Sequence, residues 1–285
     1  MTPRLAWNAY GKAAVRLVKV DRGAARHELH DLTVEVQLQG SFGPTHTAGD
    51  NSAVLPTDTM KNTVYALARQ GPVDPPEEFG ERLARHFLGA CPAARRAVLA
   101  VAVSRWDRAR VDGTPHGHTF VQGPAERRLA TVTLDEAGVG VEAGIEGLGL
   151  LKTTGSGFAG FLRDGYTTLK ETDDRILATD VEARWKYARP PRDYAGAWSA
   201  VRASLVETFA RQQSLSVQQT LYAMGEAALA RCGEIGEIRL ILPNRHHLLV
   251  DLAPFGLDNP NEIFMPTREP YGRIEAVIVR QQLSP

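Results

Sequence analysis

VLPTDTMKNTVYA (residues 54–66) and ILATDVEARWKYA (residues 176–188) carry the same Thr-Asp pair, one in each half of the chain. On both sides of the two segments the chain reads as strands interrupted by a pair of helices. A shared motif within a shared element order predicts two tandem copies of one ββααββ unit. The predicted class is α+β with antiparallel sheets and helices on one face. We expect a first unit at residues 1–136 and a second at residues 137–285.

Periodicity supports this order of elements. AVRLVKV (Ala14–Val20) and LTVEVQL (Leu32–Leu38) read as strands, and the second alternates apolar and polar residues. A helix should begin at Thr57-Asp58, where both side chains are good caps. Phe79, Leu83 and Phe87 then form one stripe of a second helix. In the second half we expect strands, a helix carrying Trp198, Arg202, Leu205 and Phe209, a helix over about Ser216–Cys232, and strands in EIRLIL, HLLVDL and IEAVIV.

The composition excludes several classes of protein. The chain of 285 residues has 33 Lys plus Arg and 33 Asp plus Glu, so its net charge is zero and it lacks the basic character of a nucleic-acid-binding protein. No apolar run is long enough to span a membrane, and the N-terminus lacks the apolar segment of a signal peptide. Cys91 and Cys232 lie outside any ligand or redox motif and are expected to be reduced. The C-terminal QQLSP is not a peroxisomal signal, so we expect a cytoplasmic, bacterial protein.

Leu151–Asp180 contains side chains suited to a flat, anionic ligand. Phe158 offers a ring to stack on and Arg175 a planar cation to pair with. The segment also contains a G-x-G-x-x-G pattern at residues 155–160. A dinucleotide site needs a helix directly after this pattern, whereas FLRDGYTTLKE is poor helix material. Glycine-rich strand ends and turns are the favoured interpretation.

Other polar residues have both a functional and a structural interpretation. Thr57 and Asp58 could cap a helix or could present its N-terminus to an anion. Asn244 and His246 would share one face of a strand, or could be its polar surface end. His27, His116 and His118 do not have the spacing of a zinc site. The composition around His116 predicts an exposed loop, and a structural role is expected for all three histidines.

The chain resembles the urate oxidase (uricase) family over nearly its whole length. Five segments carry the resemblance in the right order and at the right distances: YGKAAVRLVKV, DNSAVLPTDTMKNTVYALA, LLKTTGSGFAGFLRDGYTTLKETDDRILATDVEARW, SVQQTLYAM and LPNRHHLLVDL. The resemblance implies two tandem tunnelling-fold (T-fold) units. It also implies a homotetrameric barrel with active sites between subunits, Lys12 and Thr57 coming from one chain and the other residues from its neighbour.

The resemblance also implies a role for each site residue. Phe158 would stack on urate, Arg175 and Gln218 would grip its two edges, and Asn244 would hold dioxygen or water above the ring. The backbone N–H groups of Val217 and Asp58 would add to the grip. The residues expected to relay protons are Lys12, Thr57 and His246.

The implied reaction converts urate, dioxygen and water to 5-hydroxyisourate and hydrogen peroxide. Deprotonated urate is electron-rich enough to reduce dioxygen directly, so neither flavin nor metal is expected. The protein would bind, desolvate and move protons. Two departures from the family are visible: Pro56 replaces the usual small residue, and Arg245 replaces a common lysine. Two alternatives are another T-fold enzyme acting on a pterin or purine, and a urate-binding sensor that would not need Lys12, Thr57 and His246 together.

Overall fold

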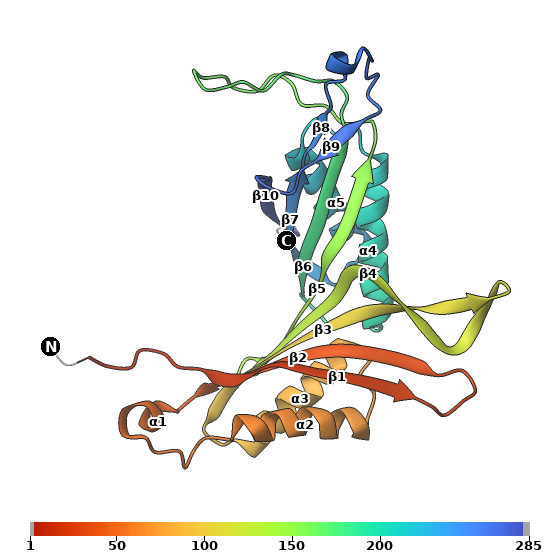
Figure 1. The fold of residues 1–285 in the computed structure, drawn as a ribbon. Coiled ribbons are helices and arrows are strands. Elements are labelled where there is room, and N and C mark those ends of the chain that lie inside the picture. Colours follow the sequence, from red (N-terminus) through yellow and green to blue (C-terminus); the bar gives the residue numbers. More distant parts are fainter. Residues whose placement is uncertain (1–2, 282–285) are drawn as a thin grey trace. The chain divides into compact units, whose positions relative to one another are not determined.

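The computed structural model describes residues 3–281 and divides them into two compact units (Figure 1). Unit 1 contains the residues up to Gly144 together with Pro190–Ala195. Unit 2 contains Ile145–Arg189 and the residues from Gly196 onward.

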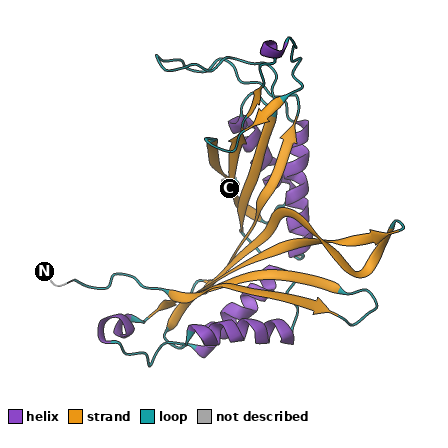
Figure 2. Ribbon diagram, viewed as in Figure 1, coloured by secondary structure: helices purple, strands orange, loops and turns teal. Residues whose placement is uncertain are grey.

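Unit 1 is an antiparallel sheet with helices packed on it. The strand order is β1-β2-β3-β4, and each neighbouring pair is antiparallel. Figure 2 shows α2 and α3 side by side along one face of these strands. The elements are β1 (Tyr10–Asp21), β2 (Glu28–Gly40), α1 (Gly43–Ala48), α2 (Thr57–Gln70), α3 (Pro76–Ala90), β3 (Ala94–Val111) and β4 (Thr114–Asp135).

The core of unit 1 lies between this sheet and the two long helices. The alternating residues of β2 predicted to share a face are all buried: Leu32, Val34, Val36 and Leu38. The stripe Phe79, Leu83 and Phe87 on α3 is fully buried as well. These side chains remove a continuous apolar surface from water, at about 1.5–3 kcal/mol for each large one. The predicted strand and helix are therefore confirmed.

Unit 2 repeats the order of elements. β5 (Gly138–Lys152) begins in unit 1 and continues into unit 2, where the strand order is β5-β6-β7-β10. β7 pairs antiparallel with both β6 and β10. The other elements are β6 (Leu177–Tyr187), α4 (Tyr194–Arg211), α5 (Val217–Arg231), β7 (Ile235–Arg245), β8 (His247–Leu249), η1 (Ala253–Phe255), β9 (Phe264–Pro266) and β10 (Gly272–Val279).

The motif that suggested duplication does not occupy equivalent positions. Thr57-Asp58 begins helix α2, whereas Thr179-Asp180 lies inside strand β6. Both units nevertheless share the order of two strands, two long helices and two strands. The element order therefore supports a repeat, and the Thr-Asp match was misleading.

Two local predictions were incomplete. Gly43–Ala48, between β2 and α2, form the short helix α1, which the apolar periodicity did not predict. HLLVDL was expected to be a strand, but only His247–Leu249 are in β8. None of the helices in residues 3–281 is both long and apolar enough to cross a membrane.

Candidate functional site

Three short segments of unit 2 are joined by backbone hydrogen bonds beside the start of α5. The Phe158 N–H donates to the Thr172 carbonyl at 2.7 Å, and the Thr172 N–H donates back at 3.1 Å. The Arg175 N–H donates to the Ser156 carbonyl at 2.7 Å. The Gly157 N–H donates to Ser214 at 2.8 Å. We call residues 155–158, 172–175 and 214 the site ladder; it brings Phe158 and Arg175 next to the segment that leads into Val217.

The glycines of this region allow the segments of the site ladder to pack closely. Gly155 has φ +72°, in the left-handed region that favours glycine. A Cβ on Gly157 would lie 3.0 Å from the carbonyl oxygens of Thr172 and Asp173. Residues 161–176, which follow the G-x-G-x-x-G pattern, contain no helix. The dinucleotide interpretation is therefore wrong, and the glycines allow backbones to approach closely.

Asp174 fixes one edge of the site ladder. Its carboxylate accepts hydrogen bonds from the Thr154 hydroxyl and the Gly155 N–H, both at 2.9 Å. The hydrogen bond from Thr154 is the largest cause lowering the pKa of Asp174, so the carboxylate form is favoured. The sequence-based assignment missed Asp174, although its place directly before Arg175 was a usable signal.

Phe158 and Arg175 form a single aromatic and cationic feature. The Arg175 guanidinium carbon lies 5.3 Å from the centre of the Phe158 ring, within the range of a cation–π interaction. The Phe161 ring stacks on Phe158 with centroids 5.0 Å apart and an interplanar angle of 14°. Sequence reasoning missed Phe161, which helps to fix the plane of the Phe158 ring.

Arg175 is desolvated and only partly satisfied. Burial lowers the pKa of its guanidinium. Within residues 3–281, the buried Nε atom has no hydrogen-bond partner. A buried donor without a partner costs about 1–3 kcal/mol, so an acceptor supplied by a ligand would relieve a cost already present in the fold.

The start of α5 presents backbone donors near the site ladder. The Ser216 hydroxyl caps the helix by accepting from the Gln219 N–H at 3.1 Å, and the Gln219 side chain accepts from the Leu215 N–H at 2.9 Å. Neither bond uses the N–H of Val217, the first residue of the helix. The Gln218 side chain is exposed. This helix end can therefore offer a backbone N–H and an amide to a ligand.

The end of β7 carries Asn244, which is half-buried and lies opposite Thr179 on β6. Arg245 forms an ion pair with Asp180 at 3.1 Å, on the face opposite Asn244 as strand alternation requires. β7 ends at Arg245, so His246 lies between β7 and β8. Strand alternation alone therefore does not place His246 beside Asn244. The His246 carbonyl accepts from the Thr267 N–H at 2.9 Å.

The remaining predicted residues belong to unit 1. Lys12 lies on β1 opposite Val36 of β2. The pairing of these two strands shifts register between Lys12 and Val15. Thr57 is the first residue of α2, and the N-cap is Pro56, with no side-chain hydrogen bond. The expectation that Thr57 and Asp58 cap this helix is therefore wrong. The Thr57 hydroxyl does not serve as a cap, and α2 begins with N–H groups that have no side-chain cap.

Asp58 connects this helix start to Lys12. Its carboxylate forms an ion pair with Lys61 at 2.5 Å. The pKa of Asp58 is lowered chiefly by the hydrogen bond from Lys61, and the charge of Lys12 adds to the effect. The positive charge of Lys12 on β1 therefore acts on the first turn of α2.

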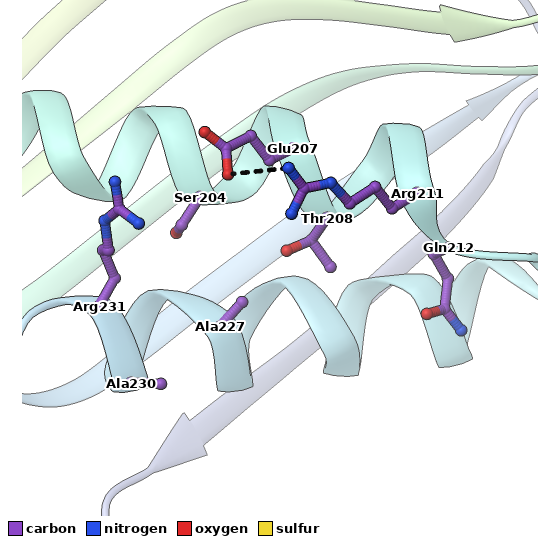
Figure 3. Close-up of a pocket in the computed structure, with 8 residues that line it drawn as sticks. All are labelled: Ser204, Glu207, Thr208, Arg211, Gln212, Ala227, Ala230 and Arg231. Atoms are coloured by element: carbon purple, nitrogen blue, oxygen red, sulfur yellow. Dashed lines mark ion pairs between the residues drawn. The ribbon is translucent and has the colours of Figure 1, made fainter.

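One cavity of unit 2 is lined by residues other than the candidate residues. Figure 3 shows a cavity of about 470 Å³ between α4 and α5, lined by Ser204, Glu207, Thr208, Arg211, Gln212, Ala227, Ala230 and Arg231. None of these is a predicted site residue. The candidate residues fall into two groups, with Lys12, Thr57 and Asp58 in unit 1 and the others in unit 2.

His27, His116 and His118 of unit 1 lie close together. The rings of His116 and His118 lie 4.5 Å apart, and that of His27 lies 6.0 Å from His118. His116 and His118 are in strand β4, so the expected exposed loop is wrong. Among residues 3–281, no group of three or more His, Cys, Asp or Glu could hold a metal ion.

Comparison with known proteins gives consistent matches. The family model described as uricase matches residues 8–133 and 141–275. A uricase of Arthrobacter globiformis is 50% identical over 277 residues, covering 97% of this chain and 90% of that protein. A uricase of Aspergillus flavus is 39% identical, covering 96% of each. The crystal structure of the Arthrobacter globiformis uricase matches with a TM-score of 0.94 and 49% identity, over 100% of this chain and 98% of that chain.

Proposed function

Because the chain belongs to the uricase family and is a urate oxidase, we propose that it converts urate, dioxygen and water to 5-hydroxyisourate and hydrogen peroxide without a cofactor. The urate anion supplies two electrons and dioxygen takes them up. Water supplies the new hydroxyl oxygen, and both atoms of dioxygen leave as peroxide. The protein then has to hold a planar anion and move protons.

The observation that carries this proposal is the desolvated Arg175 guanidinium, which lies over the Phe158 ring and whose buried Nε has no hydrogen-bond partner within residues 3–281. A guanidinium can pair with the edge of the urate anion through two parallel hydrogen bonds. Phe158 stacks on the ring, Gln218 pairs with the opposite edge through its amide, and the N–H groups of Val217 and Asp58 complete the grip. Asn244 holds dioxygen or water above the ring.

Lys12, Thr57 and His246 form the proton relay of this proposal. The positive charge of Lys12 makes the Thr57 hydroxyl more acidic, so that Thr57 can pass its proton on and take one up from the substrate or its bound water. Histidine exchanges protons near neutral pH and returns one to the developing peroxide. The absence of a side-chain cap on α2 supports this role, because the Thr57 hydroxyl is not needed to start the helix.

We also propose that the two units are tandem T-fold units and that four chains form a barrel. Each active site then combines Lys12, Thr57 and Asp58 of one chain with the unit 2 residues of its neighbour. The division of the candidate residues between the two units supports this assembly. In a symmetric assembly of identical chains, the same composite site would form at every equivalent interface.

One assay tests the reaction. Protein treated with chelator is mixed with urate in air, and the loss of the ultraviolet band of urate is followed together with peroxide formation. Equal amounts of urate lost and peroxide formed are expected. Absence of turnover would contradict the proposal, and tight urate binding without turnover would favour a sensor. Turnover that requires added metal would contradict the cofactor-free reaction.

A mixing experiment tests the composite site. Thr57→Ala and Arg175→Met chains are unfolded together and refolded, and activity is measured at a urate concentration well below the KM of the Arg175→Met protein, where each variant alone has little activity. If each site takes unit 1 and unit 2 from different chains, random mixing restores about a quarter of the sites. Refolding each variant separately and then combining them without exchange is the control. Activity that stays at the level of this control would show that one chain supplies both groups.

A further inference from the structure

The segment that leads into Thr57 is attached to the fold at few points. Residues 50–56 are in neither helix nor strand. Within residues 3–281, apart from the bond of the Met60 N–H to the Pro56 carbonyl that opens α2, two hydrogen bonds join Ser52–Pro56 to other elements. The Leu55 N–H donates to the Tyr10 hydroxyl at 3.0 Å, and the Cys91 thiol donates to the Ala53 carbonyl at 3.6 Å. The first is the shorter bond and lies two residues before Thr57.

Tyr10 is well placed to act as a fixed anchor. Its ring packs edge-on against Phe42, with centroids 4.7 Å apart and an interplanar angle of 81°. Phe42 is buried, so the tyrosine ring cannot easily turn. Burial, followed by the neighbouring Cys91, raises the pKa of Tyr10 to about 12, so its hydroxyl remains protonated throughout the neutral range.

Tyr10 also lies on the strand that carries Lys12. Tyr10, Gly11 and Lys12 pair in regular register with Leu38, Gln37 and Val36, so Tyr10 and Lys12 share one face of β1. Between them, a Cβ on Gly11 would lie 1.8 Å from the Val36 carbonyl oxygen. This close backbone approach holds β1 against β2 at the residues that flank Lys12.

We propose that Tyr10 is a positioning residue for the proton relay, because its hydroxyl fixes the start of α2 relative to Lys12 by accepting the Leu55 N–H. One side chain thus joins the strand of Lys12 to the segment of Thr57. This inference rests on the relay proposed above. The effect of the Lys12 charge on the pKa of Asp58 is consistent with it, because that charge acts on the same helix start.

The test compares two variants that each lose one phenolic oxygen. Tyr10→Phe keeps the ring and its packing on Phe42. Tyr65→Phe is the matched control, because the Tyr65 hydroxyl also bonds the backbone of unit 1, to the Arg16 carbonyl at 3.4 Å, but away from Thr57. We expect Tyr10→Phe to lower kcat about 10-fold with KM within about 2-fold. The control should keep the kcat of the parent, with kcat expressed per urate-binding site so that any misfolded fraction does not count.

A double-mutant cycle with Thr57→Ala separates positioning from a general structural effect. If Tyr10 acts through Thr57, adding Tyr10→Phe to Thr57→Ala leaves the residual kcat unchanged. A Tyr10→Phe enzyme with the kcat of the control would overturn the inference alone. The inference would also be overturned if Tyr10→Phe lowered kcat as much in the Thr57→Ala background as in the parent protein. An inactive parent protein, or a fully active Thr57→Ala variant, would instead overturn the proposed function, and this inference with it.

Discussion

Replacing Arg175 by Met should weaken urate binding far more than it slows the chemical step. Methionine keeps much of the length of the arginine stem and its contact with Phe158, but removes the guanidinium. The Arg175 side chain forms a cation–π contact at 5.3 Å, and within residues 3–281 its buried Nε has no partner. The free protein therefore loses little when the guanidinium is removed, while the complex loses the paired edge of urate.

The magnitude follows from the number of bonds lost. A hydrogen bond to a charged group contributes about 1.5–3 kcal/mol, and a fork makes two of them. Burial of the Arg175 cation has a desolvation cost, which is why its pKa is lowered. Removing the guanidinium relieves this cost, so we take the lower end of the range of about 1.5–3 kcal/mol for each hydrogen bond. About 3 kcal/mol corresponds to a loss of affinity of roughly 100-fold. Arginine keeps its charge at all working pH values, so the loss should not depend on pH.

The assay measures urate affinity in the absence of dioxygen and, separately, kcat and KM in air. Arg163→Met is the matched control, since Arg163 also lies over a phenylalanine of the same segment, 4.9 Å from Phe161, but its side chain is 50% exposed and paired with Glu171. This control should change affinity less than 2-fold. A change of less than about 3-fold for Arg175→Met would show that Arg175 does not grip the substrate.

Three further outcomes are expected. Thr57→Ala should lower kcat about 100-fold with little change in urate affinity, while Thr57→Ser keeps a hydroxyl and should retain most of the activity in the same peroxide assay. Gly157→Ala should raise KM about 10-fold, because its Cβ would press on the Thr172 carbonyl at 3.0 Å and shift the site ladder; Gly89→Ala, in open space, is the control. Burial raises the pKa of Glu77 despite its ion pair with Arg128. Because the pKa of Glu77 is higher in the folded state, its contribution to stability is greatest below its unfolded pKa of about 4.3 and is lost as pH rises through its folded pKa. Glu77→Gln should therefore make Tm depend less on pH over this range.

The sequence predicted the elements that are held by apolar periodicity. β2 and α3 could be found because each buries one face, and burial leaves a period of two or of about four residues in the chain. Ser216–Cys232 was also placed correctly, since both predicted ends are the caps of α5. The short helix α1 escaped notice because it has no buried residue and therefore no apolar period.

The candidate site was only partly readable from the chain. Phe158 and Arg175 could be selected by residue type, since a ring and a planar cation suit a flat anion. The site ladder that brings them together depends on backbone hydrogen bonds, which join Phe158 to Thr172, Arg175 to Ser156 and Gly157 to Ser214. Backbone groups are the same in every residue, so such pairing leaves little trace in side-chain patterns. Asp174 was the one side chain whose position offered a clue.

The repeat of elements does not produce a repeated site. In unit 1 the uncapped helix start belongs to α2, which is the first of the two long helices that follow β2. In unit 2 the helix start beside the site ladder belongs to α5, which is the second of the long pair. The proposed site therefore takes different helix ends from the two units, and each brings a partial positive charge toward one anion. Matching Thr57 with Thr179 could not locate this site, because the second unit contributes a different element.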